Sequence, residues 1–223
     1  MIMMYHHIYI QNIMTDKWTF EIIESKRNGS CFYDSIANAM TENVSDWYEF
    51  PILRERMEKY WNDYHEKTGE TLLGVTDKLI RFMCSENIDK DILEMYNVEA
   101  EFRKDSGEKG VHVFKSVDAY KHHVLNTNCW ADHSIFLSFH KSLGNRCSLI
   151  VFDSEIGGIP HLDREWTENK DIYICLRREN DHYSTIRLIK DDAKMDLCVN
   201  RATMLDLVDN MNETLESKIS IVL

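Results

Sequence analysis

Cys31 lies where a thiol could act as a nucleophile. It follows the polar turn KRNGS at residues 26–30 and begins the amphipathic run CFYDSIANAM, which predicts a helix. The attacking species is a thiolate, and the unpaired N–H groups and dipole at a helix N-terminus stabilise negative charge. The backbone N–H groups of Gly29 and Ser30, just before the cysteine, could turn toward an oxyanion. The segment therefore predicts a nucleophilic cysteine with a lowered thiol pKa.

A nucleophilic thiol needs a base, and His182 is the best placed of the ten histidines. It lies in the polar stretch RRENDHYS between two apolar runs. If these runs are strands, they would hold His182 at the end of a sheet, where its side chain stays accessible. Its distance from Cys31 along the chain is no objection, because catalytic groups assemble in space. A lone cysteine is more often a small buried hydrophobe, and a histidine at a strand edge more often caps a loop. The residues alone leave both interpretations open.

The elements that must position these residues are those of an α/β (α+β) domain, with a small central sheet packed between helices. Apolar runs at 147–152 and 172–176 predict strands covered on both faces, and residues 183–189 predict a third strand. Residues 18–23 predict a short strand, whereas the charged residues 99–111 predict a mobile loop. Helices are expected from residue 31, from Pro51, over 79–84 and 92–96, around 117–125, after Trp130 and near 202–215.

Length and composition indicate one domain over residues 1–223, with a core over about 18–190 and a helical C-terminal extension over about 200–217. Asp and Glu (38) outnumber Lys and Arg (26), and the formal charge of −12 argues against nucleic acid as a partner. The six scattered cysteines form no CxxC pair, which favours reduced thiols. No membrane-spanning run or signal-peptide pattern occurs, so we expect a cytoplasmic protein, in a host cytosol if it is viral or from an intracellular bacterium.

A zinc site is one alternative for the middle of the chain. His122, His123, Cys129 and His133 fall within twelve residues and are of the types that bind zinc. Their spacings match no standard zinc pattern, and a helix would place these side chains on different faces. Surface histidines on a polar helix are the preferred interpretation, and no metal or organic cofactor is expected.

Three separated segments resemble the ovarian-tumour (OTU) family of cysteine deubiquitinases, in the family's order. Residues 28–37, NGSCFYDSIA, are similar to the family's Asp-Gly-Asn-Cys block ahead of a helix. Residues 130–139, WADHSIFLSF, followed by the run LIVFD, resemble its Trp-Gly segment, helix and next strand. Residues 172–176 and then DHYSTI at 181–186 resemble its strand, Asn-His-Tyr loop and final strand.

This resemblance implies a papain-like fold and a thiol protease that cleaves isopeptide bonds between ubiquitin and lysine side chains. Cys31 would attack the carbonyl of the ubiquitin C-terminal glycine, and His182 would move the protons. The backbone N–H groups of Gly29, Ser30 and Cys31 would hold the oxyanion. The partners would be ubiquitin or polyubiquitin chains, bound by a monomer, and Trp130 and Tyr183 are candidates for contact with the substrate.

The chain departs from the family's pattern at the residue that orients the histidine. Asn28 replaces an Asp three residues before the cysteine, and Ser184 replaces the Asp or Asn two residues after the histidine. We predict that Asn28 orients the imidazole through its amide oxygen, with Ser184 as the alternative. Ala131 replaces a glycine beside Trp130, so Trp130 could equally be a core tryptophan. The competing functions are a ubiquitin-binding module or pseudo-enzyme with the same fold, and a protease for another ubiquitin-like modifier.

Overall fold

The structure is a computed structural model that describes residues 17–91, 99–103, 109–114, 116–126, 129–131, 133–153 and 170–210. Its helices are α2 (Cys31–Glu42), α3 (Val44–Tyr48), α4 (Pro51–Thr68), α5 (Asp77–Glu86), α7 (Val117–Asn126) and α8 (His133–Ser142). Its strands are β1 (Trp18–Ile23), β2 (Glu99–Arg103), β3 (Lys109–Val113), β4 (Cys147–Asp153), β5 (Ile172–Glu179), β6 (His182–Lys190), β7 (Ala193–Lys194) and β8 (Cys198–Asn200). Residues 201–210 are also helical.

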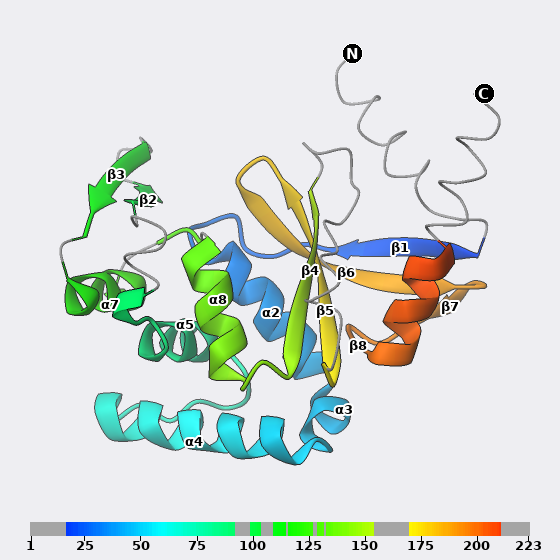
Figure 1. Cartoon of the computed structure of the whole chain (residues 1–223), viewed down its shortest axis with the longest axis horizontal. Coiled ribbons are helices and arrows are strands. Elements are labelled where there is room, and N and C mark those ends of the chain that lie inside the picture. The colour runs from blue at the N-terminus through cyan, green and yellow to red at the C-terminus, as the bar shows by residue number, and fades with distance from the viewer. Residues whose placement is uncertain are drawn as a thin grey trace.

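The main sheet runs in the order β1-β6-β5-β4, and short strands β7 and β8 pair with β6 and β5. Strands β4 and β5 are parallel, whereas β5–β6 and β1–β6 are antiparallel. Helix α2 runs alongside this sheet, with α5, α8 and α4 packed beyond it (Figure 1). The α/β class and the small sheet packed against helices, both predicted from the sequence, are confirmed.

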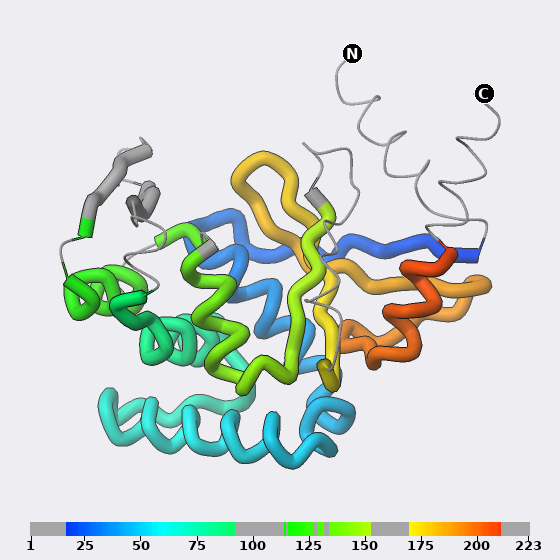
Figure 2. The backbone as a smooth tube through the Cα atoms, viewed as in Figure 1, coloured from blue at the N-terminus to red at the C-terminus, as the bar shows by residue number. Residues whose placement is uncertain are grey.

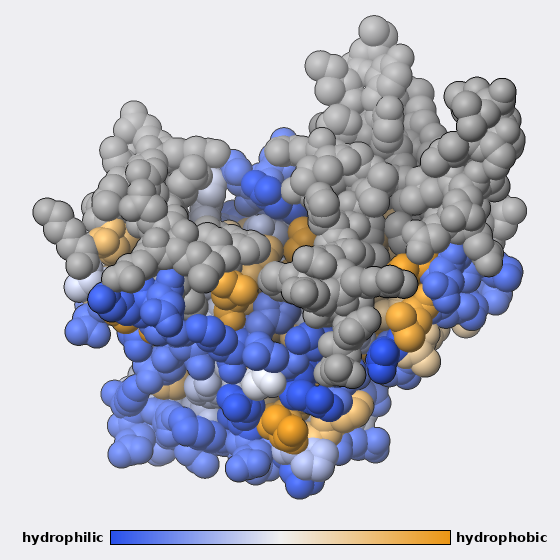
Figure 3. All heavy atoms as spheres, in the orientation of Figure 1, coloured by the Kyte–Doolittle hydropathy of each residue, from blue (hydrophilic) through white to orange (hydrophobic). Residues whose placement is uncertain are grey.

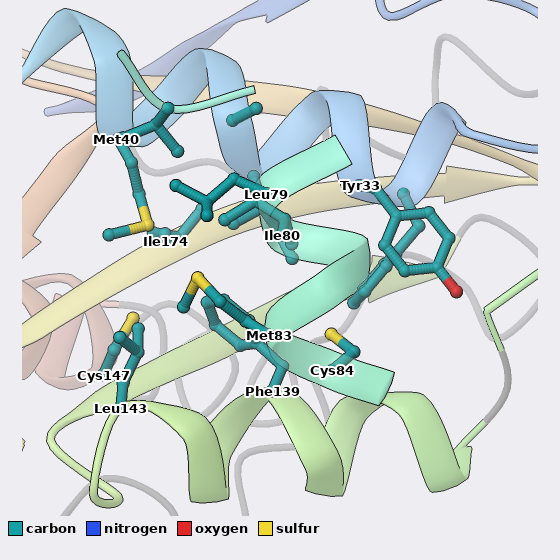
Figure 4. Close-up of a cluster of buried hydrophobic side chains, with 14 of the residues drawn as sticks. Tyr33, Met40, Leu79, Ile80, Met83, Cys84, Phe139, Leu143, Cys147 and Ile174 are labelled. Atoms are coloured by element: carbon teal, nitrogen blue, oxygen red, sulfur yellow. The ribbon is translucent and has the colours of Figure 1, made fainter. Parts of the chain in front are cut away.

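Helix α2 forms because its apolar residues recur at helical spacing and most of the helix is buried. Tyr33 and Met40 on α2 face Leu79 and Met83 on α5, and residues of α8 and β5 complete the cluster (Figure 4). Full burial of each such side chain stabilises the fold by about 1.5–3 kcal/mol. The helix that begins with Cys31 is therefore anchored in the centre of the domain.

Strand β5 separates two apolar clusters, as its continuous apolar sequence predicts. Ile172, Ile174 and Leu176 belong to the cluster around α2. The alternate residues Tyr173 and Cys175 belong to a second cluster, together with Trp18, Ile186, Leu188, Met204 and Leu207. Because successive side chains of a strand point to opposite faces, both faces of β5 are covered. The strand beside the candidate histidine is thus held on both sides.

Two predicted segments differ from the structure or lie outside it. The expected loop at 99–111 instead contains β2 and β3, which pair as an antiparallel ribbon from Glu99↔Val113 to Arg103↔Lys109. Valine and phenylalanine favour strands, and here they occur on both sides of a polar connection. The helix expected over 92–96 lies outside the described residues, as does the end of the helix expected over 202–215, which begins at residue 201.

Helix α4 covers the bottom of the domain with a one-sided pattern. Leu53, Met57, Tyr60 and Tyr64 recur at helical spacing and are buried. The opposite face is hydrophilic, as the lower part of the space-filling view shows (Figure 3). Among the described residues, no helix combines the length and the apolar character needed to cross a bilayer.

Several core cysteines carry raised thiol pKa values because burial disfavours the thiolate. Burial raises the pKa of Cys175 to about 12, and it also raises the pKa of Cys84, Cys147 and Cys198. Each folded thiol keeps its proton to a higher pH than the unfolded thiol, whose pKa is about 8.5. The stability from this source is complete below that pKa and is lost as the pH rises.

We therefore expect the free energy of unfolding to fall above about pH 8.5, by about 1.4 kcal/mol per pH unit for each such thiol. Urea unfolding measured between pH 7 and pH 10 checks this expectation. Cys175→Ala should make the fall in the free energy of unfolding less steep, by about 1.4 kcal/mol per pH unit. An unchanged slope in that variant would contradict the assignment of the effect to these buried thiols.

Candidate active site

Cys31 is the first residue of α2, and only 6% of its surface is exposed. The turn before it is closed by Asn28, whose backbone oxygen accepts the Cys31 N–H at 3.2 Å. The Asn28 side-chain oxygen accepts the Ser30 N–H at 2.9 Å. The sulfur lies 4.0 Å from the backbone oxygen of Asp181. The helix start predicted from the sequence therefore lies against the residue that precedes His182.

His182 begins β6 directly after a tight turn. Glu179 and His182 are paired across the β5–β6 hairpin, so Asn180 and Asp181 form the turn. Asn180 has φ of 54°, in the left-handed region that asparagine tolerates better than most residues. The His182 side chain is 21% exposed. The hairpin holds the imidazole at the edge of the sheet and keeps it accessible, as the sequence predicted.

Glu24 is the residue that contacts the imidazole, and sequence reasoning missed it. Its Oε2 atom lies 3.2 Å from His182 Nε2. The same oxygen accepts a hydrogen bond from the Ser184 hydroxyl at 3.3 Å. Ser184 thus contacts the carboxylate rather than the imidazole. A carboxylate beside the ring can fix its orientation and stabilise the imidazolium, which neither Asn28 nor Ser184 could do by charge.

Strand pairing explains why Glu24 reaches the histidine. The β1–β6 register ends at Ile23↔Thr185, and one further step places Glu24 opposite Ser184. His182 and Ser184 point to the same face of β6 because side chains alternate along a strand. The Ser25 hydroxyl donates to the Tyr183 backbone oxygen and ties the segment after β1 to β6. The two segments lie side by side in the tube view (Figure 2).

The Cys31 thiol contacts the residue before His182, and no hydrogen bond joins the thiol to the imidazole. The Cys31 thiol donates to the backbone oxygen of Asp181, and the His182 ring contacts Glu24 through Nε2. Because Nε2 is used by Glu24, Nδ1 is the ring nitrogen left to exchange a proton with the sulfur. Catalytic hydrogen bonds are often long before substrate binds and tighten in the complex.

The Cys31 thiol does not have the lowered pKa that its place at a helix start predicts. Burial raises the pKa of this thiol above its ordinary value, and the Asp34 carboxylate raises it further. The backbone N–H groups of Tyr183, Phe32 and Cys31 act in the opposite direction, because they favour the thiolate. Desolvation is the larger effect, so the sulfur is protonated at neutral pH and needs a base to remove its proton.

The predicted oxyanion donors are only partly available. The N–H groups of Ser30 and Cys31 both donate to Asn28, which leaves Gly29 as the predicted donor with no recorded backbone acceptor among the described residues. The backbone N–H of Phe32 favours the thiolate of Cys31 and lowers its pKa, and the sequence did not single this group out. Asn28 makes its hydrogen bonds within this turn, and the carboxylate that contacts the His182 ring belongs to Glu24.

The two predicted substrate contacts have different surroundings. The Tyr183 ring is 8% exposed and packs edge-on against Phe32 and Phe136, with ring centroids 5.4 and 5.9 Å apart. Tyr183 is therefore a core residue, although it directly follows His182 in the chain. Trp130 is partly exposed just before α8, and its backbone oxygen accepts a hydrogen bond from the Cys129 thiol.

The described residues contain no group of three or more His, Cys, Asp or Glu side chains arranged to hold a metal ion. His122 is exposed, whereas His123 and Cys129 are buried. The fourth predicted zinc-binding residue, His133, begins α8, and its side chain lies outside the described part of the structure.

Solved structures similar to this chain are OTU domains bound to ubiquitin. An ovarian tumour (OTU) domain in complex with ubiquitin has a TM-score of 0.48 and 12% identity, over 90% of this chain and 89% of that chain. An OTU deubiquitinase from Wolbachia pipientis wMel bound to ubiquitin has a TM-score of 0.41 and 16% identity, over 79% and 98%. The Hazara virus OTU bound to ubiquitin has a TM-score of 0.34 and 15% identity, over 78% and 92%.

No protein-family model matches the chain, and no curated protein matches it by sequence. The likenesses among solved structures are too distant to transfer the role of any residue. Any role for Cys31, His182 or Glu24 must therefore be argued from the geometry of this chain itself.

Proposed function

We propose that the chain is a cysteine-type deubiquitinase of the OTU family that hydrolyses isopeptide bonds at the ubiquitin C-terminus. The observation that carries the proposal is the arrangement around His182. His182 directly follows Asp181, whose backbone oxygen contacts the Cys31 sulfur. The Nε2 atom of His182 faces the Glu24 carboxylate. A nucleophile at a helix start, a base and an orienting acid are the parts that acyl transfer by a thiol requires.

In the proposed reaction, His182 takes the proton of the Cys31 thiol through Nδ1 as the sulfur attacks the carbonyl of the ubiquitin C-terminal glycine. The tetrahedral intermediate expels the lysine amine, to which the imidazolium gives its proton, and a thioester remains on Cys31. His182 then takes a proton from water, which attacks the thioester and releases the carboxylate of ubiquitin, and the imidazolium returns this proton to the departing Cys31 sulfur. Glu24 holds the ring and stabilises its charged form throughout.

The oxyanion would be held by backbone N–H groups at the start of α2. Gly29 and Phe32 are the donors that the surroundings of Cys31 favour, and a rotation of the Asn28 side chain would also release the Ser30 N–H. Each such donor commonly contributes about 2.7–4 kcal/mol to stabilisation of the transition state. No metal or organic cofactor takes part in this reaction.

The proposed partners are ubiquitin or polyubiquitin chains, with a ubiquitin-like modifier as the alternative, bound by a monomer. The formal charge of −12 suits a partner whose contact surface is rimmed with basic residues. None of the six cysteines forms a disulfide, which supports the cytosol as the proposed compartment. The proposed domain covers residues 1–223.

A ubiquitin-binding module without turnover is the second candidate, and two observations favour it. The Cys31 thiol has a raised pKa, and it makes no recorded hydrogen bond with the imidazole of His182. A module of this kind would bind ubiquitin through the same fold and leave the thiol unreacted.

Treatment with ubiquitin that carries a C-terminal electrophile separates the two functions. An enzyme is expected to form a covalent adduct that peptide mapping places on Cys31, and prior treatment with iodoacetamide should prevent it. Saturable binding without an adduct would identify a binding module. Adduct formation with a ubiquitin-like modifier and not with ubiquitin would change the proposed substrate.

A further inference from the structure

A buried carboxylate lies one turn along the helix that carries the candidate nucleophile. Asp34 is the fourth residue of α2, and only 9% of its surface is exposed. Its charge disfavours the thiolate of Cys31 and helps to raise the pKa of that thiol, so Asp34 does not activate the sulfur. A buried charge is costly unless it is paired and hydrogen-bonded. The bonds that Asp34 makes therefore indicate its role.

The Asp34 carboxylate holds the segment that connects β1 to α2. Its Oδ2 atom accepts a hydrogen bond from the backbone N–H of Lys26 at 3.0 Å. Its Oδ1 atom lies 3.3 Å from the Lys26 ammonium. The Lys26 side chain is 65% exposed, so the ion pair adds little, whereas the bond to the backbone is charge-assisted and directed. Asp34 therefore acts mainly on the backbone of this segment.

The segment between β1 and α2, residues 24–30, carries Glu24 at its start and leads directly into Cys31. Lys26 is two residues beyond Glu24, a span of at most about 7 Å, so a fixed Lys26 N–H limits where Glu24 can lie. The Glu24 side chain is 55% exposed, and packing contributes little to its position. Its place beside His182 therefore depends on how the backbone of this segment is held.

The segment is held to both elements of the candidate site. The Ser25 hydroxyl donates to the Tyr183 backbone oxygen, which holds the segment to β6 directly after His182. The Asp34 carboxylate binds the next residue along the chain, Lys26, and so holds the segment to α2. Ser25 and Asp34 are both buried, so water competes little for these bonds. Together the two bonds fix the orienting acid relative to the base and to the nucleophile.

We infer that Asp34 is a positioning residue, which ties this connecting segment to α2 and so places the Glu24 carboxylate against the His182 imidazole. The bond to the Lys26 N–H is the contact through which it acts. The inference rests on the proposed function and deepens it, because it names a support for the proposed orienting acid. It differs from a purely structural role for Asp34 in one respect. The effect of this bond on the Cys31 thiol should require Glu24.

The test compares two uncharged residues at position 34, because any such change also removes the charge that disfavours the thiolate. Asp34→Asn keeps an oxygen that can accept the Lys26 N–H, whereas Asp34→Ala does not. The measurement is the rate of alkylation of Cys31 by iodoacetamide at pH 7.5, followed on the Cys31 peptide by mass spectrometry. The alanine variant should react about fivefold more slowly than the asparagine variant, because a displaced Glu24 no longer stabilises the imidazolium that accompanies the thiolate.

The same two variants are then compared in proteins that also carry Glu24→Ala. Without the carboxylate there is nothing to position, so the two rates should agree within about twofold. An effect of Asp34 on the turn before Cys31 would instead persist without Glu24. Equal rates while Glu24 is present, or rates that differ more than this in its absence, would overturn the inference.

Two further variants separate the backbone bond from other effects. Lys26→Met removes the ammonium but keeps the N–H, so it should change the alkylation rate less than about twofold. A fall in Lys26→Met of the size predicted for Asp34→Ala would assign the effect to the ion pair and overturn the inference. Asp171→Ala is the matched control, because the Asp171 side chain is 13% exposed against 12% for Asp34 and pairs with Arg146 at the opposite end of β5. It should lower stability and leave the alkylation of Cys31 unchanged.

If Asp34→Ala does not fold, Asp34→Leu takes its place, because leucine has nearly the shape of asparagine and no acceptor. Because iodoacetamide needs no ubiquitin, this test and the proposed substrate can fail separately. A Glu24-dependent difference in a protein that forms no ubiquitin adduct would support the role of Asp34 and reject the deubiquitinase. An adduct together with equal rates for alanine and asparagine at position 34 would do the reverse.

Discussion

Cys31→Ala is expected to abolish hydrolysis of a ubiquitin C-terminal amide while the fold and the binding of ubiquitin persist. The substitution removes only the thiol group, and in the proposed mechanism the sulfur of this group forms the covalent intermediate. Loss of a catalytic nucleophile commonly costs about 10⁶-fold in kcat, which reduces turnover below detection. Release of a fluorogenic amine from ubiquitin measures the loss, and titration with labelled ubiquitin measures the binding.

Cys175→Ala is the matched control, since it also removes one buried thiol. Cys175 lies in the second apolar cluster, on the far face of β5. Each change deletes a small buried side chain and should cost about 1–3 kcal/mol of stability at most. Of these two single variants, only Cys175→Ala should retain turnover. Retained activity in Cys31→Ala would move the nucleophile to another residue.

Glu24→Ala is expected to lower kcat about ten- to hundredfold with little change in KM. The carboxylate oxygen contacts His182 Nε2 at 3.2 Å, so its loss frees the ring to rotate and removes a charge that stabilises the imidazolium. The Glu24 side chain is 55% exposed, and water can replace part of the interaction. We therefore expect less than the roughly 10⁴-fold loss that follows mutation of a buried orienting acid.

Three companion variants show whether the effect belongs to this carboxylate. Glu21→Ala, which changes a carboxylate on β1 three residues before Glu24 that pairs with Lys194 and Arg187, should leave kcat unchanged. Ser184→Ala should lower kcat less than Glu24→Ala, because Ser184 acts only through the same oxygen. Asn28→Ala should alter the turn before Cys31. A larger loss of kcat in Asn28→Ala, with Glu24→Ala near wild type, would return the orienting role to Asn28.

The elements that carry the site could be predicted because their sequences have strong local patterns. The run CFYDSIANAM has the spacing of a buried helix, and IYICL has the continuous apolar character of a strand covered on both faces. Both became elements of the core, as α2 and β5. The place of His182 at the start of β6 follows from the polar turn before it.

Glu24 could not be found from sequence because its role depends on strand register. It follows β1 by one residue, and only the pairing of Ile23 with Thr185 brings it opposite Ser184 and near His182. Register is set by the whole sheet and by the turns, and no local pattern reveals it. The acidic residue directly after the predicted strand at 18–23 was the available signal, and it becomes informative once the partner strand is known.

The pKa of Cys31 shows a similar limit. A helix start predicts a lowered thiol pKa. The degree of burial decides whether the pKa of Cys31 is in fact lowered or raised, and burial depends on how α2 packs in the folded domain. Asp34, one turn along α2, adds to the rise in pKa. In the proposed reaction, His182 must therefore deprotonate this thiol.

The most direct test of the account is to trap the acyl-enzyme. Wild-type protein mixed with an isopeptide-linked diubiquitin and quenched in acid within milliseconds to seconds should yield a ubiquitin thioester on Cys31, seen by intact mass and by peptide mapping. Hydroxylamine should cleave the conjugate, and Cys31→Ala should not form it. Cleavage of the isopeptide bond with no thioester, or with ubiquitin attached to another residue, would contradict the account.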